Sequence, residues 1–214
     1  MKIKTSIIYF LLFSLMITIG CKKGENDPFL SFNSRSERIV GEWTLTKYDK
    51  NVLYLDSSDN YWDKELLSYV FDGEKLNFTF TEEDESDKFD TTMTHDYFLN
   101  LTINEDGTFV MKSQLDSSAN EIEGNWWWVD MPKDKSGINF DPPIFNNFDY
   151  LYSSYFYYFD YYEFFFFTNN NNFSIDRLSS SDFIINQSLT IKGIEDDFLG
   201  RIDNNSNYTF EKTK

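Results

Sequence analysis

Residues 97–113 read YFLNLTINEDGTFVMKS, and this stretch decides the fold. Apolar residues occupy alternate positions on both sides of the turn at Asp106-Gly107. A period of two is typical of a half-buried strand, and Asp-Gly between two such runs is a strong signal for an antiparallel hairpin. One face of this hairpin is predicted to carry Leu99, Leu101, Ile103, Phe109 and Met111.

The same alternation recurs along much of the chain, interrupted by short polar turns. Further strands are predicted at residues 38–48, 76–81, 121–129, 173–177, 182–185, 188–191 and 208–212. A short helix is predicted at residues 61–71, and residues 131–143 are predicted to be a loop. Regularly spaced short strands with few helices between them favour an all-β barrel or sandwich.

The first twenty-one residues, MKIKTSIIYFLLFSLMITIGC, have the pattern of an export signal. Two lysines precede an apolar run at residues 7–19, which is shorter than the roughly 20 residues needed to span a bilayer. Gly20-Cys21 resembles the lipobox of bacterial lipoproteins, although Thr18 stands where that family usually has leucine. The resemblance implies cleavage before Cys21 and lipidation of its thiol. An uncleaved anchor helix with an incidental cysteine is the alternative.

The sequence after the cysteine is polar and contains glycine, proline, asparagine and serine. We therefore predict a signal peptide at residues 1–20, a flexible tether at 21–37 and one folded domain at 38–214. The charged residues just after Cys21 are similar in part to the surface-export signals of lipoproteins in the Bacteroidota. This resemblance implies an exported protein, lipid-anchored to the bacterial outer membrane on its periplasmic face or at the cell surface.

Three short motifs occur in the order found in lipocalin-like lipoproteins. They are Gly41-Glu42-Trp43, then Asp106-Gly107-Thr108-Phe109, then Gly124-Asn125-Trp126. The resemblance implies an antiparallel up-and-down β-barrel, with unusual insertions near residues 50–75 and 131–172. It also implies that Trp43 closes the barrel bottom beneath a late arginine. The only late arginines, Arg177 and Arg201, do not lie on the predicted last strand.

Composition excludes several classes of function. A formal net charge of −17 argues against nucleic acid as a partner. Cys21 is the only cysteine and His95 the only histidine, so internal disulfides and multi-histidine metal sites are excluded. The acidic run at residues 82–90 is compatible with a calcium loop, but it lacks EF-hand spacing, and a solvated loop is the preferred interpretation. We expect no enzymatic activity, catalytic residue, metal or cofactor.

The tryptophans are the candidate ligand-binding residues, because indole rings pack well against flat apolar ligands. Trp43, Trp126 and Trp128 are assigned to this role, with core packing as the competing interpretation. Successive side chains of a strand point to opposite faces, so Trp127 is expected to be exposed and available for an interaction.

Residues 145–172 contain fifteen aromatic residues in twenty-eight positions. Acidic residues inside the run, such as Asp160, argue against a membrane span. A strand at residues 155–167 would be aromatic on both faces, so we predict that its outer face is covered, either by the loop at residues 131–150 or by a partner. Tyr158 and Tyr162 are candidate exposed interaction residues.

Two functions are compatible with this pattern. The first is a membrane-anchored lipocalin-like module that binds a small apolar or aromatic ligand in the open end of its barrel. The second is a cell-surface module with a solid barrel that binds an envelope protein or a glycan. A mouth-open cavity would favour the first function, and a packed interior would favour the second.

Overall fold

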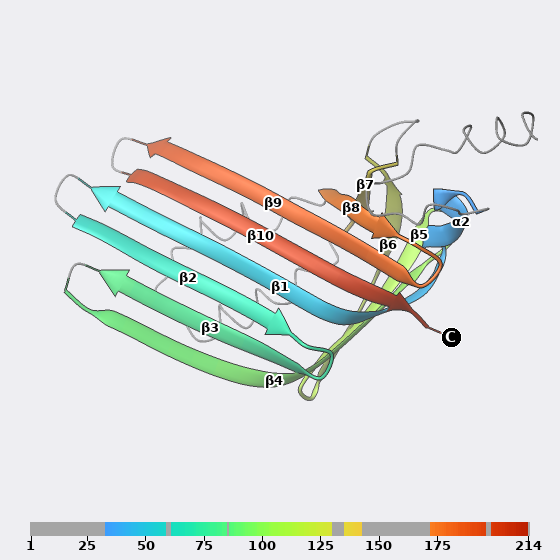
Figure 1. Cartoon of the computed structure of the whole chain (residues 1–214), viewed down its shortest axis with the longest axis horizontal. Helices are drawn as coiled ribbons and strands as arrows, with labels where there is room; N and C mark the ends of the chain where they lie inside the picture. The colour runs from blue at the N-terminus through green and yellow to red at the C-terminus, as the bar shows by residue number, and fades with distance from the viewer. Residues whose placement is uncertain are drawn as a thin grey trace, which may run out of the picture.

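The computed structural model describes residues 33–58, 61–84, 86–129, 135–142, 172–195 and 198–213. These residues form one short helix and ten strands (Figure 1). The elements are α2 (Arg35–Ile39), β1 (Gly41–Ser58), β2 (Tyr61–Phe71), β3 (Lys75–Asp84), β4 (Lys88–Ile103), β5 (Thr108–Leu115), β6 (Ser118–Trp128), β7 (Gly137–Asp141), β8 (Asn172–Leu178), β9 (Asp182–Glu195) and β10 (Phe198–Lys212).

The strands form an antiparallel up-and-down sheet that closes in a ring, so the predicted all-β class is confirmed. Each strand pairs with its neighbour in sequence, and β1 pairs with β10 to complete the ring. At one end, residues 41–44 of β1 also pair with residues 100–103 of β4. Eight strands therefore close the ring at this end, here called the closed end. Further along, β2 and β3 lie between β1 and β4 and widen the ring.

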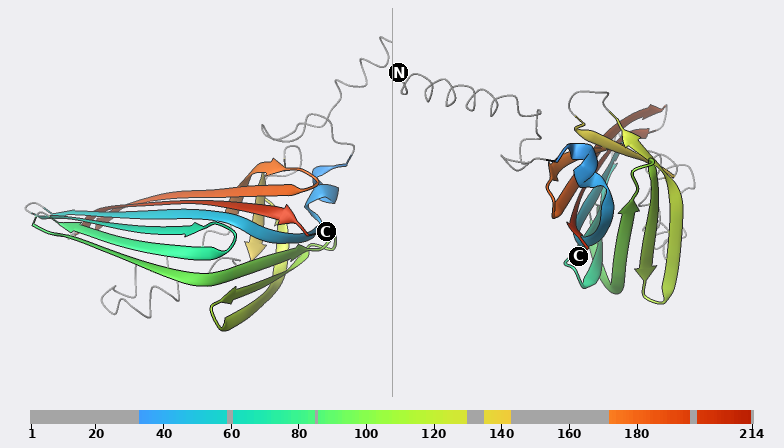
Figure 2. Two further views of the ribbon diagram at one scale, coloured as in Figure 1. Left: turned by 60° about the horizontal axis from the view of Figure 1, so that its bottom comes forward. Right: turned by 90° about the vertical axis from the view of Figure 1, so that its right-hand side faces the viewer.

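Six strands extend past β5 to β8 on the side away from the closed end. Figures 1 and 2 show β9, β10, β1, β2, β3 and β4 as one curved sheet that projects away from the closed end. The inner side of this sheet, here called the concave face, continues the interior of the ring. The structure therefore combines a packed end with an extended sheet, on whose inner side Tyr69, Phe78 and Phe80 are buried.

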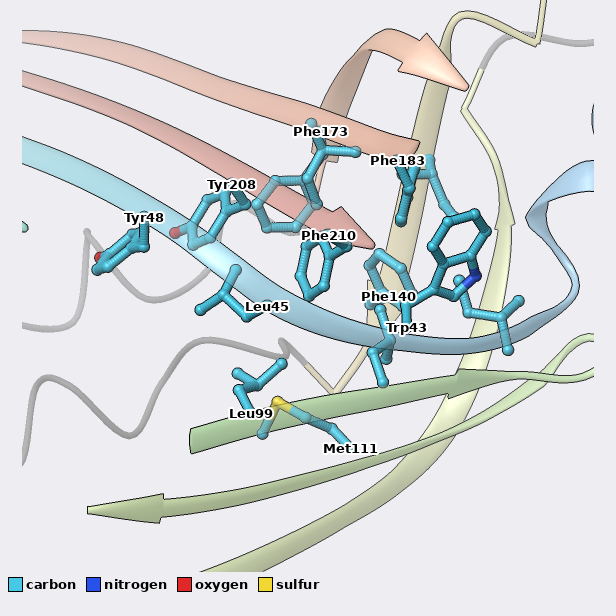
Figure 3. Packing of buried hydrophobic residues seen from close by; sticks show 14 of the residues in the cluster. Trp43, Leu45, Tyr48, Leu99, Met111, Phe140, Phe173, Phe183, Tyr208 and Phe210 are labelled. Carbon is cyan, nitrogen blue, oxygen red and sulfur yellow. The ribbon is translucent and has the colours of Figure 1, made fainter. Parts of the chain in front are cut away.

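Large apolar side chains fill the closed end (Figure 3). The largest fully buried residues are Trp43, Tyr48, Tyr208, Phe71, Phe109, Phe140, Phe183, Phe210, Ile39, Leu76, Leu99 and Leu101. Complete burial of one such side chain contributes about 1.5–3 kcal/mol. This core is the main source of stability in the described part of the chain.

A β-bulge in β1 changes which residues face the core. The register with β10 shifts between Leu45 and Lys47. Trp43 and Leu45 face inward before the bulge, and Tyr48 and Lys50 face inward after it. The bulge therefore moves the inward set from odd to even positions.

The predicted hairpin at residues 97–113 is confirmed. β4 and β5 pair from Tyr97–Leu115 to Ile103–Phe109, and all five predicted core residues are buried. Asp106 accepts hydrogen bonds from the Thr108 amide (3.0 Å) and hydroxyl (2.7 Å), which lowers the pKa of its carboxyl group. Gly107 adopts a φ of 89°, a conformation that glycine readily supplies.

The predicted helix at residues 61–71 is wrong, because this segment is strand β2. Its backbone pairs with both β1 and β3, and Tyr69 and Phe71 alternate with outward Val70. The local pattern was ambiguous, and pairing on both sides determines the outcome. The segment 50–75, interpreted as an insertion, consequently supplies part of the ring wall.

Three predicted boundaries also change. The loop expected at residues 131–143 contains β7, in which Ile138 and Phe140 are buried and alternate with polar neighbours. The acidic run at residues 82–90 belongs mostly to β3 and β4, which leaves only a short turn. Residues 182–185 and 188–191, predicted as two strands, are parts of β9.

Helix α2 overlaps the predicted tether. Ser34 and Glu37 form a capping box, in which the Ser34 hydroxyl accepts from the Glu37 amide and the Glu37 carboxylate accepts from the Ser34 amide. The folded part therefore begins before the expected boundary at residue 38. In the ranges given above, no helix is long and apolar enough to cross a membrane.

Some predictions lie outside the described residues. They concern the signal peptide, the lipobox cysteine Cys21, and the aromatic segment 145–171 with Tyr158 and Tyr162. Their roles stay predictions.

Candidate functional site

Trp43 lies at the closed end, where it is completely buried. Its indole N–H donates to the Ile39 carbonyl at 2.7 Å, and its ring packs against Phe183 with centroids 5.5 Å apart. Lys212 covers it, with the Nζ atom 5.1 Å from the ring centroid. The same ammonium donates to the Val40 carbonyl at 2.9 Å, so Trp43 is fixed on several sides.

The covering cation is therefore a lysine on the last strand. Of the two arginines considered, Arg177 lies on β8, and Arg201 lies on β10 beside Asp203 (Nε–Oδ2 2.7 Å). Gly41 is needed beside Lys212, because its φ is 140° and an added Cβ would stand 2.6 Å from Lys212 Cε. The expectation that neither arginine lies on the last strand is wrong for Arg201, because β10 begins at Phe198.

The other candidate tryptophans lie on β6 with the expected alternation. Trp126 is buried, and its indole N–H donates to the Asn104 carbonyl at 2.9 Å. Trp128 is half-buried, packs edge-on against Trp126 at 5.6 Å, and lies beneath the Lys135 ammonium. Trp127 points outward and is 45% exposed, as predicted. Binding roles for these four tryptophans stay predictions, and the contacts of Trp43 and Trp126 are those of core residues.

The concave face carries a second cluster, which sequence reasoning missed. We call it the concave patch, and it consists of Tyr48, Lys50, Tyr69, Asn204, Ser206 and Tyr208. Strand register brings it together, because Lys50 pairs with Ser206 on β10 and with Tyr69 on β2. Three strands thus supply an ammonium, hydroxyls and an amide to one side of the sheet, and all of these side chains except that of Lys50 are buried.

The tyrosines of the concave patch lie on the boundary with the packed core. Tyr48 stacks on Tyr208 with centroids 4.7 Å apart, and Tyr69 lies 6.5 Å from Tyr48. Figure 3 shows the hydroxyl groups of Tyr48 and Tyr208 directed away from Trp43. The rings of Tyr48 and Tyr208 therefore lie toward the closed end, and their hydroxyl groups lie toward the extended sheet.

Polar groups of the concave patch are held in a largely dry environment. Asn204 and Ser206 are buried, and the Ser206 hydroxyl donates to Asn204 Oδ1 at 3.3 Å. Lys50 is half-buried, and its Nζ lies 5.5 Å from the centroid of the Tyr69 ring. Electrostatic attraction is strong where water is limited, so this arrangement suits a ligand with an apolar body and a negative end.

Two further titratable groups lie near the margin of the concave face. Burial raises the pKa of Tyr97, whose ring packs edge-on against Phe71 at 5.3 Å. His95 Nδ1 lies 2.8 Å from Asp116 Oδ2, and this contact, with the Asp96 amide, lowers the pKa of Asp116. His95 is thus tied to the β5–β6 turn. In the described parts of the chain, no three acidic, histidine or cysteine residues are grouped to hold a metal ion.

The concave patch escaped prediction for two reasons. The β1 bulge places Lys50 on the inner face, whereas simple alternation from Trp43 places it outside. The local pattern predicts a helix at Tyr69, and β10 contains three asparagines at positions 204, 205 and 207, a residue type that is depleted in strands. The one usable signal was the alternation of Ser206, Tyr208 and Phe210.

Searches against protein-family models, curated proteins and solved structures find no match to this chain.

Proposed function

We propose that this chain is an exported lipoprotein, anchored through Cys21, whose lipocalin-like barrel binds a small amphipathic ligand. The ligand is apolar or aromatic over most of its surface and carries an acidic group. The anchor rests on the lipobox resemblance, and the barrel type rests on the three ordered motifs. The outer membrane is the proposed location.

The concave patch is the observation that carries the binding function. It combines stacked tyrosines with one half-buried ammonium on the inner face of the ring. Packing of the closed end restricts a ligand to the extended part of the inner face. Lys50 would pair with the acidic group, while the tyrosine rings would contact the apolar body.

Replacing Lys50 tests this assignment. We expect Lys50→Met to weaken binding of cis-parinaric acid, a fluorescent fatty acid, by about tenfold or more, because a hydrogen bond to a charged group contributes about 1.5–3 kcal/mol. Binding of the methyl ester should change little. The measurement is fluorescence titration of protein that lacks residues 1–21, after circular dichroism has established a folded β-sheet.

Lys47→Met is the matched control, because Lys47 lies on the same strand with its side chain exposed outside the ring. It should leave both affinities unchanged. An equal loss for acid and ester would show that Lys50 does not recognise charge. If the unsubstituted protein binds neither probe and a wider lipid screen also fails, the ligand-binding function is wrong.

The proposed anchor makes a separate prediction. We expect Cys21→Ala to abolish metabolic labelling by a radioactive fatty acid and to shift the protein from the membrane fraction to a soluble or uncleaved form. The reason is that two or three acyl chains, at about 0.8 kcal/mol per buried CH₂, provide nearly permanent attachment. Labelling that persists in this variant would identify another lipidated residue.

A cell-surface interaction module is the second candidate, favoured by the outward side of β6. Trp127 and Val129 are both substantially exposed there, and exposed aromatic residues are enriched at protein interfaces. Trp127→Ala should then reduce capture of the partner from envelope extract while leaving fatty-acid binding intact. Loss of fatty-acid binding instead would contradict this second function.

A further inference from the structure

The extended part of β4 is an edge of the sheet. Residues 88–96 pair with β3, whereas β5 begins to pair only at Tyr97. Figure 1 shows this part of β4 along the margin of the six strands that extend past β5 to β8. Among the described residues, no strand lies on the outer side of residues 88–95.

The backbone contacts of Asp96 show which groups this edge presents. The Asp96 carbonyl accepts from the Asp116 amide at 2.8 Å, and the Asp96 amide donates to Asp116 Oδ1 at 2.9 Å. The Asp96 amide and carbonyl therefore both point away from β3, toward the open edge of the sheet. The β3–β4 register is unbroken, so the backbone groups of Thr94, Thr92 and Asp90 point the same way.

We propose that a second copy of this chain pairs with this edge, antiparallel about a two-fold axis at Thr92. Each copy would donate and accept backbone hydrogen bonds at Asp90, Thr92 and Thr94, which continues the β4 ladder into the partner. Because the two-fold axis is perpendicular to the sheet, the concave faces of the two copies lie on the same side of the combined sheet. Such isologous contacts are the commonest way in which identical chains associate.

Side-chain chemistry is compatible with this register. Thr92 lies opposite its own copy, Asp90 lies opposite Thr94, and no like charges face each other. The side chains of Asp90, Thr92 and Thr94 are all exposed. An axis at Asp90 would place two carboxylates in opposition, which is destabilising. An axis at Thr94 would run the incoming strand into the Asp116 turn, which already occupies the position beside Asp96.

The charges at the two ends of the paired segment are also complementary. Backbone pairing would end at Thr94, because Asp116 already occupies the position beside Asp96, and the Lys88 side chain of each copy would extend toward the carboxylates of Asp96 and Asp116. On the inner side, Phe89 is 55% exposed and would lie opposite His95 of the other copy. An exposed edge of this kind is a template for pairing unless another strand covers it.

Cysteine crosslinking of the full chain tests the proposal. In a hydrogen-bonded antiparallel pair the two Cα atoms lie about 5.5 Å apart, which is within the range of roughly 4.4–6.8 Å that a disulfide requires. Thr92→Cys should therefore give a disulfide-linked species of twice the chain mass in oxidised lysates. Unsubstituted protein measures any background from Cys21.

Thr79→Cys is the matched control. Thr79 lies on β3 beside Thr92, with hydroxyl oxygens 3.1 Å apart, but one strand further from the axis. Adjacent strands are about 4.8 Å apart, so two Thr79 positions would be too distant to crosslink. The proposal requires several-fold more homodimer from Thr92→Cys than from Thr79→Cys. Equal yields would overturn it.

A charge pair then tests the register. Thr94→Lys, added to Thr92→Cys, would face Asp90 of the other copy and should raise the crosslinked fraction. Thr94→Asp would face the same carboxylate and should lower it. Both variants lose the same hydrogen bond to Asn77, so an opposite response reports the partner. Equal responses, or crosslinking only to a different protein, would contradict pairing between copies.

Discussion

Trp43→Ala is expected to lower the free energy of unfolding by about 3–5 kcal/mol, the usual cost of removing a fully buried tryptophan or phenylalanine side chain. Trp43 is completely buried at the closed end, and the substitution also removes the ring beneath Lys212. Partial collapse around Phe183 would recover only some of this loss. The measurement is urea unfolding followed by circular dichroism, which does not depend on the deleted fluorophore.

Trp127→Ala is the control, because it removes the same side chain from an exposed position on β6. Surface substitutions usually change stability by less than about 0.5 kcal/mol. Similar losses from Trp43→Ala and Trp127→Ala would mean that the closed end does not dominate stability. A stable Trp43→Ala variant would likewise contradict the packing described for this tryptophan.

Gly124→Ala is expected to give the second large effect. An added Cβ would stand 2.2 Å from the Asp141 carbonyl oxygen and 2.6 Å from Pro142 Cδ. Backbone atoms cannot turn aside as a flexible side chain can, so β6 and β7 must separate. Overpacking of this kind typically costs about 1–3 kcal/mol, occasionally more. Thermal unfolding should show a melting temperature lower by several degrees.

Asn125→Ala is the matched control on the neighbouring position. Its side chain is exposed, so the change adds no atom against β7. The melting temperature should stay close to that of the unsubstituted protein. If Gly124→Ala proves as stable as Asn125→Ala, the strands must approach each other less closely than the structure indicates.

Local patterns in the sequence predicted the hairpin at residues 97–113 well, because its signals lie within a few residues. Asp106-Gly107 and the alternation on both sides of it define β4 and β5 without information from elsewhere. β7 was missed because five residues between polar loops carry little local signal. β2 was assigned to a helix because the partners that settle its conformation, β1 and β3, are not visible in its own pattern.

The candidate site was the least predictable part, since it depends on register between distant strands. Lys50 meets Tyr69 and Ser206 only after a bulge has shifted the face that β1 presents. Tryptophan content directed attention to Trp43 and Trp126 instead, which lie in the same buried cluster as the three tyrosines of the concave patch. Composition thus located aromatic residues, while the bulge determined which polar groups reach the interior.

The pairing of β1 with β10 has a consequence for how the chain reaches its native state. These are the first and last strands of the described chain, and their contacts complete the ring. Contacts between residues far apart in sequence form slowly, because the loop between them must first lose conformational entropy. During synthesis from the N-terminus, β1 emerges long before β10. Throughout that interval the Trp43 side chain lacks its Lys212 cover, and apolar side chains of this kind favour aggregation while they are exposed.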